Sequence, residues 1–122
     1  MKNLEQIRAA NAFAAASGTT FKGANDGEVV KKLPPMIRAN GILGALAFAM
    51  ENDRKTGHAD VFRAIVAHLA TLKRLPGAGR MELAGFLQDL SSADAATLRA
   101  VTQEAMAYLS YLRRFARKGD EE

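Results

Sequence analysis

Two adjacent prolines, Pro34 and Pro35, lie inside a segment that otherwise has the pattern of an amphipathic helix. Each proline lacks a backbone N–H, and its ring presses on the carbonyl four residues back, so we expect a kink or a break at this step. The pair Asn40 and Gly41 follows a few residues later and favours a turn. The segment therefore predicts a kinked helix, a turn, and a second helix that is almost wholly apolar.

Helical spacing of apolar residues extends over nearly all of the remaining sequence, and no segment alternates as a strand does. We expect a first helix over residues 3–17 and a second that begins at Asn25 or Asp26, has a stripe through Ile37 and is interrupted by the prolines. Further helices are expected over 42–50, over 57–74, after residue 79, and from a cap at Ser91 to about residue 118. The fold class is an all-α, single-domain bundle of about five or six helices, with a Pro-kinked second helix and a long C-terminal helix. Residues 1–118 form the helical domain, and residues 119–122 are an acidic tail.

Two of these helices have clear buried faces. The helix over 57–74 carries the strongest amphipathic pattern, with its stripe at Val61, Phe62, Ile65, Val66, Leu69 and Leu72. The apolar residues of the last helix alternate spacings of three and four, which predicts packing along its whole length. These residues are Leu98, Val101, Ala105, Tyr108, Leu112 and Phe115.

The composition limits the compartment and the chemistry. The 122 residues include no cysteine, so the chain has neither a disulfide nor a thiolate metal site. The first residues lack the apolar core of a signal peptide, and we find no apolar run long enough to span a membrane. We expect a cytoplasmic protein.

No set of residues predicts catalysis, a metal site or a cofactor. His58 and His68 are the only histidines, and ten residues apart on one helix they point in different directions. We interpret both as packed or half-exposed side chains. The Gly77-Ala78-Gly79 sequence has no strand before it, so it reads as a loop. The sequence therefore gives no support for an enzyme.

Basic residues are the better lead to a partner. The net charge is +4, and without residues 120–122 the body has 17 cations against 10 carboxylates, a net +7. The candidates for nucleic-acid contact are Lys31, Lys32, Arg38, Lys73, Arg74, Arg113, Arg114, Arg117 and Lys118. The four cations that end the last helix have a simpler explanation, because they complement the helix dipole. Tyr108, Tyr111 and Phe115 could stack on bases, but Tyr108 and Phe115 belong to the apolar seam.

The run from Lys32 to Phe48, KLPPMIRANGILGALAF, resembles the signature of the small helical subunit of type III-B CRISPR RNA-silencing complexes, the fifth protein of the Cmr module. The beginning, Leu4 to Ala9, is similar to how members of this family begin. The signature positions, which we expect to be mainly structural, are Leu33, Pro34, Pro35, Ile37, Asn40, Gly41, Leu46 and Phe48.

The resemblance implies a non-catalytic subunit for antiviral defence, whose copies form a minor filament beside the backbone subunits. Its partners would be the backbone and large subunits of the Cmr ribonucleoprotein, further copies of itself, and guide and target RNA bound through the RNA backbone. No membrane is implied. The alternative is a stand-alone basic helical regulator that binds nucleic acid. That function needs a polar, exposed helix after the turn at Gly41, whereas residues 42–50 are almost wholly apolar.

Overall fold

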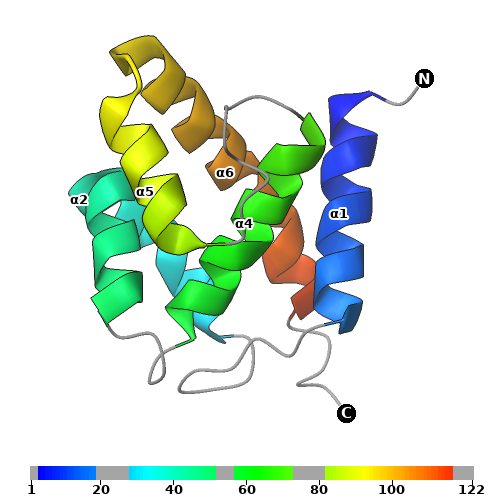
Figure 1. The fold of residues 1–122 in the computed structure, drawn as a ribbon. Coiled ribbons are helices and arrows are strands. Elements are labelled where there is room, and N and C mark those ends of the chain that lie inside the picture. Colours follow the sequence, from blue (N-terminus) through cyan, green and yellow to red (C-terminus); the bar gives the residue numbers. More distant parts are fainter. Residues whose placement is uncertain (1–2, 19–27, 52–56, 73–81, 117–122) are drawn as a thin grey trace.

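The computed structural model describes residues 3–18, 28–51, 57–72 and 82–116. Nearly all of these residues are helical, and these ranges contain no strand. The helices are α1 (Leu4–Gly18), α2 (Glu28–Glu51), α4 (His58–Leu72), α5 (Leu83–Ser92) and α6 (Ala95–Ala116) (Figure 1). The all-α bundle is confirmed. The predicted acidic tail and the predicted loop at 77–79 lie outside the described residues.

Gly41, and not the proline step, divides α2 into two helical segments. Its backbone has φ 79° and ψ 161°, whereas Pro34 and Pro35 lie within helical backbone. The predicted turn at Gly41 is confirmed, and the expected kink or break at the prolines is not a break, because the helical backbone continues through them. The helix persists across the prolines because Leu33 and Ile37, on either side of them, are both buried in the bundle. This burial offsets the two backbone hydrogen bonds that the prolines cannot make.

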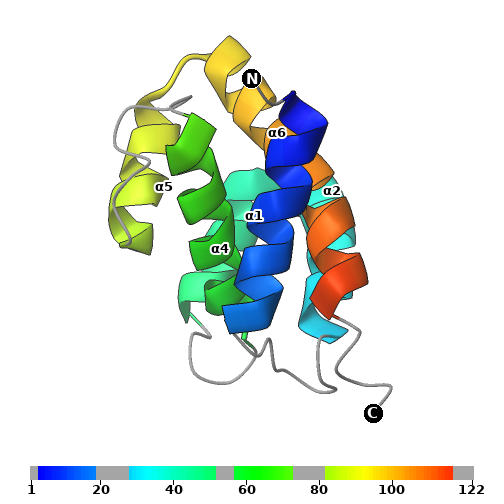
Figure 2. The same ribbon diagram turned by 90° about the vertical axis from the view of Figure 1, so that its right-hand side faces the viewer.

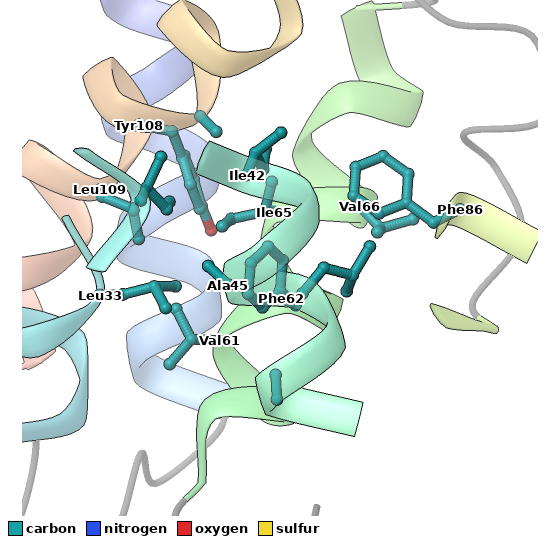
Figure 3. Packing of buried hydrophobic residues seen from close by; sticks show 14 of the residues in the cluster. Leu33, Ile42, Ala45, Val61, Phe62, Ile65, Val66, Phe86, Tyr108 and Leu109 are labelled. Carbon is teal, nitrogen blue, oxygen red and sulfur yellow. The ribbon is translucent and has the colours of Figure 1, made fainter. Parts of the chain in front are cut away.

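Helix α4 lies at the centre of the bundle and contacts every other helix that the structure describes (Figures 1 and 2). Its predicted stripe is fully buried from Val61 to Leu69, and only Leu72 at its end is half-buried. Figure 3 shows this stripe packed against side chains from α2, α5 and α6. The labelled residues there are Leu33, Ile42, Ala45, Val61, Phe62, Ile65, Val66, Phe86, Tyr108 and Leu109.

The long helix α6 begins at a cap that differs from the predicted one. The backbone N–H of Thr97 donates to Asp94 Oδ1 over 2.7 Å, so Asp94 is the capping residue. Ser91 belongs instead to α5, where its hydroxyl donates to the carbonyl of Gln88 over 3.0 Å. The expected cap at Ser91 is therefore wrong, because α5 continues two residues beyond Leu90, the last residue of its apolar pattern. The predicted seam of α6 is confirmed.

Helix α1 packs on α6 and α4 with little apolar burial. Asn3 caps it: the N–H of Gln6 donates to Asn3 Oδ1 over 2.8 Å, and the N–H of Asn3 donates to Gln6 Oε1 over 2.9 Å. Of its described side chains, only Ala12 is fully buried. Polar contacts must therefore hold much of this helix in place.

One segment, Val29–Glu51, is by length and composition apolar enough to cross a membrane, contrary to the sequence expectation. Buried helices of soluble proteins meet the same criterion. Here Leu33, Ile37, Ile42 and Leu46 of this segment are buried in the bundle core. Composition therefore does not separate a membrane segment from a core helix, and the packing favours a core helix.

Candidate nucleic-acid interface

Four of the predicted basic residues lie at one end of the bundle. Lys31 and Lys32 are near the start of α2, and Arg113 and Arg114 are in the last turn of α6. In both views the beginning of α2 and the end of α6 are neighbours at the lower end of the molecule (Figures 1 and 2). All four side chains are exposed. We call these four residues the basic end.

Stabilisation of a helix dipole accounts for the two arginines of the basic end but not for its two lysines. Arg113 and Arg114 complement the negative end of the α6 dipole, as the simpler reading expected. Lys31 and Lys32 stand near the positive end of the α2 dipole, where cations are unfavourable.

Arg38 extends the basic end along α2. It follows Lys31 by seven residues, which is two helical turns or about 10 Å, and both side chains are exposed. Lys32 is oriented differently, since its charge acts on His58 at the start of α4. Burial, and to a smaller degree Lys32, lowers the pKa of His58. The other candidates, Lys73, Arg74, Arg117 and Lys118, lie outside the described residues.

The signature positions divide between core and surface. Leu33, Ile37 and Leu46 are buried. Pro34 is half-buried, and Pro35, Asn40 and Gly41 are exposed. Phe48, which we expected in the core, is 37% exposed and packs edge-to-face on His58 with ring centroids 5.2 Å apart. The signature therefore includes both buried and exposed positions.

The exposed part of the signature belongs to an apolar surface. In the helical segment after Gly41, the side chains of Ala47 and Phe48 face solvent together with Gly44. A hollow of about 470 Å³ lies beside this segment, between the turn at Gly41 and the first half of α6. Its lining residues are Asn40, Gly41, Ile42, Leu43, Leu98, Arg99, Thr102 and Gln103. We call it the Gly41 hollow. A segment with such a face lacks the polar side chains that a groove-reading helix needs, so the stand-alone regulator finds no support here.

A buried polar network, which the sequence did not predict, fastens α1 to the rest of the bundle. Arg8 of α1 donates to both carboxylate oxygens of Glu104 on α6, from Nε and from Nη2, each over 2.8 Å. His68 Nε2 lies 2.8 Å from Glu104 Oε2, and His68 Nδ1 lies 2.9 Å from Asn11 Nδ2. Asn11 Nδ2 also donates to Thr71 Oγ1 over 2.9 Å. We call these five residues the α1 clamp.

One consistent set of protons satisfies the α1 clamp. Thr71 donates its hydroxyl hydrogen to the carbonyl of His68 over 2.7 Å, so its oxygen accepts from Asn11. The second N–H of Asn11 then donates to Nδ1 of His68, which makes His68 neutral with its hydrogen on Nε2. Glu104 is ionised and accepts from Arg8 and His68.

The electrostatics agree with an ionised Glu104. Burial by itself would raise the pKa of Glu104, but the hydrogen bonds from Arg8 and His68 outweigh it and lower that pKa below its ordinary value of 4.5. Glu104 is 4% exposed and Arg8 24%. The His68 ring also stacks on Tyr108, with centroids 4.4 Å apart and an angle of 12°. These contacts make His68 part of the α1 attachment.

One residue of the α1 clamp, Glu104, could have been recognised from the sequence. Glu104 lies three residues after Val101 and four before Tyr108, so it occupies a position of the apolar seam. A carboxylate there needs a buried partner. Nothing in the sequence identifies Arg8 as that partner, because 96 residues separate the two.

Both histidines are buried, which agrees with the packed interpretation, and they lie at different places. His68 belongs to the α1 clamp, whereas His58 packs on Phe48. Over the ranges that the structure describes, no three His, Asp or Glu side chains are grouped to hold a metal ion.

Comparison with known families gives one match. Residues 4–118 match the model of the family described as CRISPR-associated protein (Cas_Cmr5). Searches of curated proteins and of solved structures gave no match. The matched region covers nearly the whole chain, including α1, the signature and the basic end. The protein therefore belongs to the CRISPR-associated protein family Cas_Cmr5.

Proposed function

We propose that this member of the Cas_Cmr5 family is a non-catalytic small subunit of a type III-B CRISPR effector complex in the cytoplasm. Its copies line up as a minor filament beside the backbone subunits, near the large subunit. The basic end contacts the phosphates of paired guide and target RNA. Family membership implies a subunit of a CRISPR Cmr complex.

The observation that carries the RNA contact is the convergence of cations from two distant parts of the sequence. Lys31 and Lys32 are separated from Arg113 and Arg114 by more than 80 residues, yet they share one end of the bundle. An RNA duplex shows a regular array of phosphates, and its deep major groove hides the bases from side chains. Cations on rigid helices suit such a backbone, which they recognise by shape and charge.

The observation that favours protein partners is the apolar surface after Gly41. Ala47 and Phe48 are exposed there, and the Gly41 hollow lies at the beginning of the same helical segment, beside α6. Soluble proteins seldom leave contiguous apolar surface uncovered. This surface lies on α2 beyond Gly41, whereas Lys31 and Lys32 of the basic end lie at the start of α2. The two surfaces adjoin at His58, on which the charge of Lys32 acts and against which Phe48 packs, so bound RNA and a neighbouring subunit would lie side by side there.

A salt titration tests the RNA contact. The variant with Lys31, Lys32, Arg113 and Arg114 all replaced by alanine should bind RNA more weakly, and its affinity should depend less on salt. Each lost phosphate contact reduces the slope of log affinity against log salt by roughly 0.7–0.9. The control is Arg99→Ala, an exposed cation in the first half of α6. An unchanged slope in the fourfold variant would refute the proposed contact.

A reconstitution tests the protein contact. Ala47→Arg places a charge on the apolar surface, and we expect the variant to fold normally and to lose its place in the assembled complex. The matched control is Ala67→Arg, at an exposed position in the middle of α4. Equal incorporation of both variants would contradict this part of the proposal.

A further inference from the structure

Phe13 on α1 is an exposed aromatic side chain that the fold does not explain. It is 61% exposed, more than any other large hydrophobic side chain among the described residues. Its ring meets Phe115 of α6 edge-to-face, with centroids 5.4 Å apart and an interplanar angle of 82°. The ring is thus held in place from one side while much of its surface faces solvent.

The neighbours of Phe13 on α1 leave its ring uncovered. The positions three and four residues away on the same helix all carry small, uncharged side chains. They are Ala9, Ala10, Ala16 and Ser17. No long side chain of α1 can therefore fold over the ring, and the ring stands above a flat surface.

Cations adjoin this aromatic pair. Arg113 and Arg114 immediately precede Phe115 in the last turn of α6, and both are exposed. Among the described residues, no carboxylate forms an ion pair with either arginine. The end of α1 and the end of α6 lie side by side at the lower end of the bundle (Figures 1 and 2). Phe13 is therefore continuous with the basic end.

We propose that Phe13, held by Phe115, is a stacking platform for an unpaired base of single-stranded RNA, whose neighbouring phosphates lie on Arg113 and Arg114. Aromatic rings beside a cationic groove are the general means by which proteins bind single strands without reading their sequence. A base in the interior of a duplex is stacked on both faces, so an unpaired base is the occupant that offers the ring a free face along a strand.

This inference rests on the proposed function and extends it. The basic end by itself would bind any polyanion, whereas the platform makes the subunit prefer a strand with free bases over a continuous duplex. A protein segment is the other possible occupant, but the positive charge of the basic end favours a polyanion.

The test uses the full chain, a 12-nucleotide oligouridine and a blunt RNA duplex of equal length, at low salt. Phe13→Ala should weaken binding of oligouridine by about tenfold, within the roughly 5- to 150-fold range expected for loss of one stacked base. Duplex affinity and the salt slope should not change, because no charge is lost.

A tryptophan reporter makes the test independent of folding defects. The chain contains no tryptophan, so Phe13→Trp introduces a single indole. This variant should keep the affinity for oligouridine, and its fluorescence should be quenched when the strand binds. The control is Phe48→Trp, at the second exposed phenylalanine among the described residues, whose fluorescence should not respond.

Three results would overturn the platform while leaving the proposed function intact: unchanged oligouridine affinity in Phe13→Ala, an equal loss for the duplex, or an unquenched Phe13→Trp. Loss of assembly with purified partner subunits at unchanged RNA affinity would assign Phe13 to a protein contact instead. If the wild-type chain binds neither RNA at low salt, the platform and the RNA contact of the basic end both fail.

Discussion

Removing Arg8 should destabilise the fold more than neutralising its partner Glu104. In Arg8→Met the carboxylate of Glu104, which is 4% exposed, loses two hydrogen bonds and keeps only His68. Leaving one member of a buried ion pair without its partner costs about 3–5 kcal/mol. Because Arg8 is 24% exposed, water can reach the site, and we expect about 3 kcal/mol, toward the lower end.

Glu104→Gln should lower the free energy of unfolding by less than Arg8→Met does, about 1–2 kcal/mol. The glutamine keeps the shape and one acceptor, and the charge left unpaired is that of Arg8, which can reach solvent. The free energy of unfolding is measured by urea titration at about pH 7, with helix content followed by circular dichroism near ~222 nm. The double variant completes a mutant cycle and should be more stable than additivity predicts by about 1–3 kcal/mol.

The pH dependence gives the same prediction a second readout. The pKa of Glu104 is lower in the folded protein than its ordinary value of 4.5, so its ionised form stabilises the fold above that value. This contribution is lost as the pH falls through the folded-state pKa. The stability gap between wild type and Glu104→Gln should therefore narrow in acid. Equal costs for Arg8→Met and Glu104→Gln, or additive effects in the double variant, would refute the reasoning.

Three further substitutions test the helix boundaries by the same urea titrations. Gly41→Ala should lower the free energy of unfolding by about 1–3 kcal/mol, because φ 79° and ψ 161° lie in a region open essentially to glycine alone. A steric clash does not contribute, since no atom lies within 4 Å of the added Cβ. A cost below about 0.5 kcal/mol would contradict this backbone conformation. Pro35→Ala should stabilise the protein by about 1–2 kcal/mol, because the alanine N–H can donate a hydrogen bond to the Lys31 carbonyl inside a continuous stretch of helix. An unchanged stability would indicate a break at the prolines. The Thr97 N–H stabilises the ionised form of Asp94 and so lowers the pKa of that carboxyl. Asp94→Ala should therefore lower the free energy of unfolding at pH values above this pKa, and the effect should disappear in acid. A loss that does not depend on pH would exclude the cap as its cause.

Periodicity located the helices because apolar faces determine their packing. The stripe from Val61 to Leu69 predicted the buried face of α4, and the spacing on α6 predicted its seam. The prolines misled because local rules describe an isolated helix. In the bundle, burial of Leu33 and Ile37 on either side holds the helical backbone across them. Gly41 was predictable, since its conformation is a local property of the residue.

The candidate interface was predictable only in its residue types. Lys31 and Arg113 could be named from the sequence, but their approach depends on how α2 and α6 pack, which no local pattern contains. The same holds for Arg8 and Glu104 in the α1 clamp. Phe13 escaped notice because a phenylalanine in a helix usually indicates a buried face, and only the structure shows that its ring is 61% exposed.

We propose that the chain contributes RNA contact to an effector complex as a non-catalytic subunit. The most direct test measures target-RNA affinity of the reconstituted complex in three forms: with the wild-type chain, with the fourfold alanine variant of the basic end, and without the chain. We predict the tightest binding and the steepest salt dependence for the wild type, with guide-directed cleavage chemistry still present in all three. Equal affinity and equal salt dependence of all three forms would contradict the account.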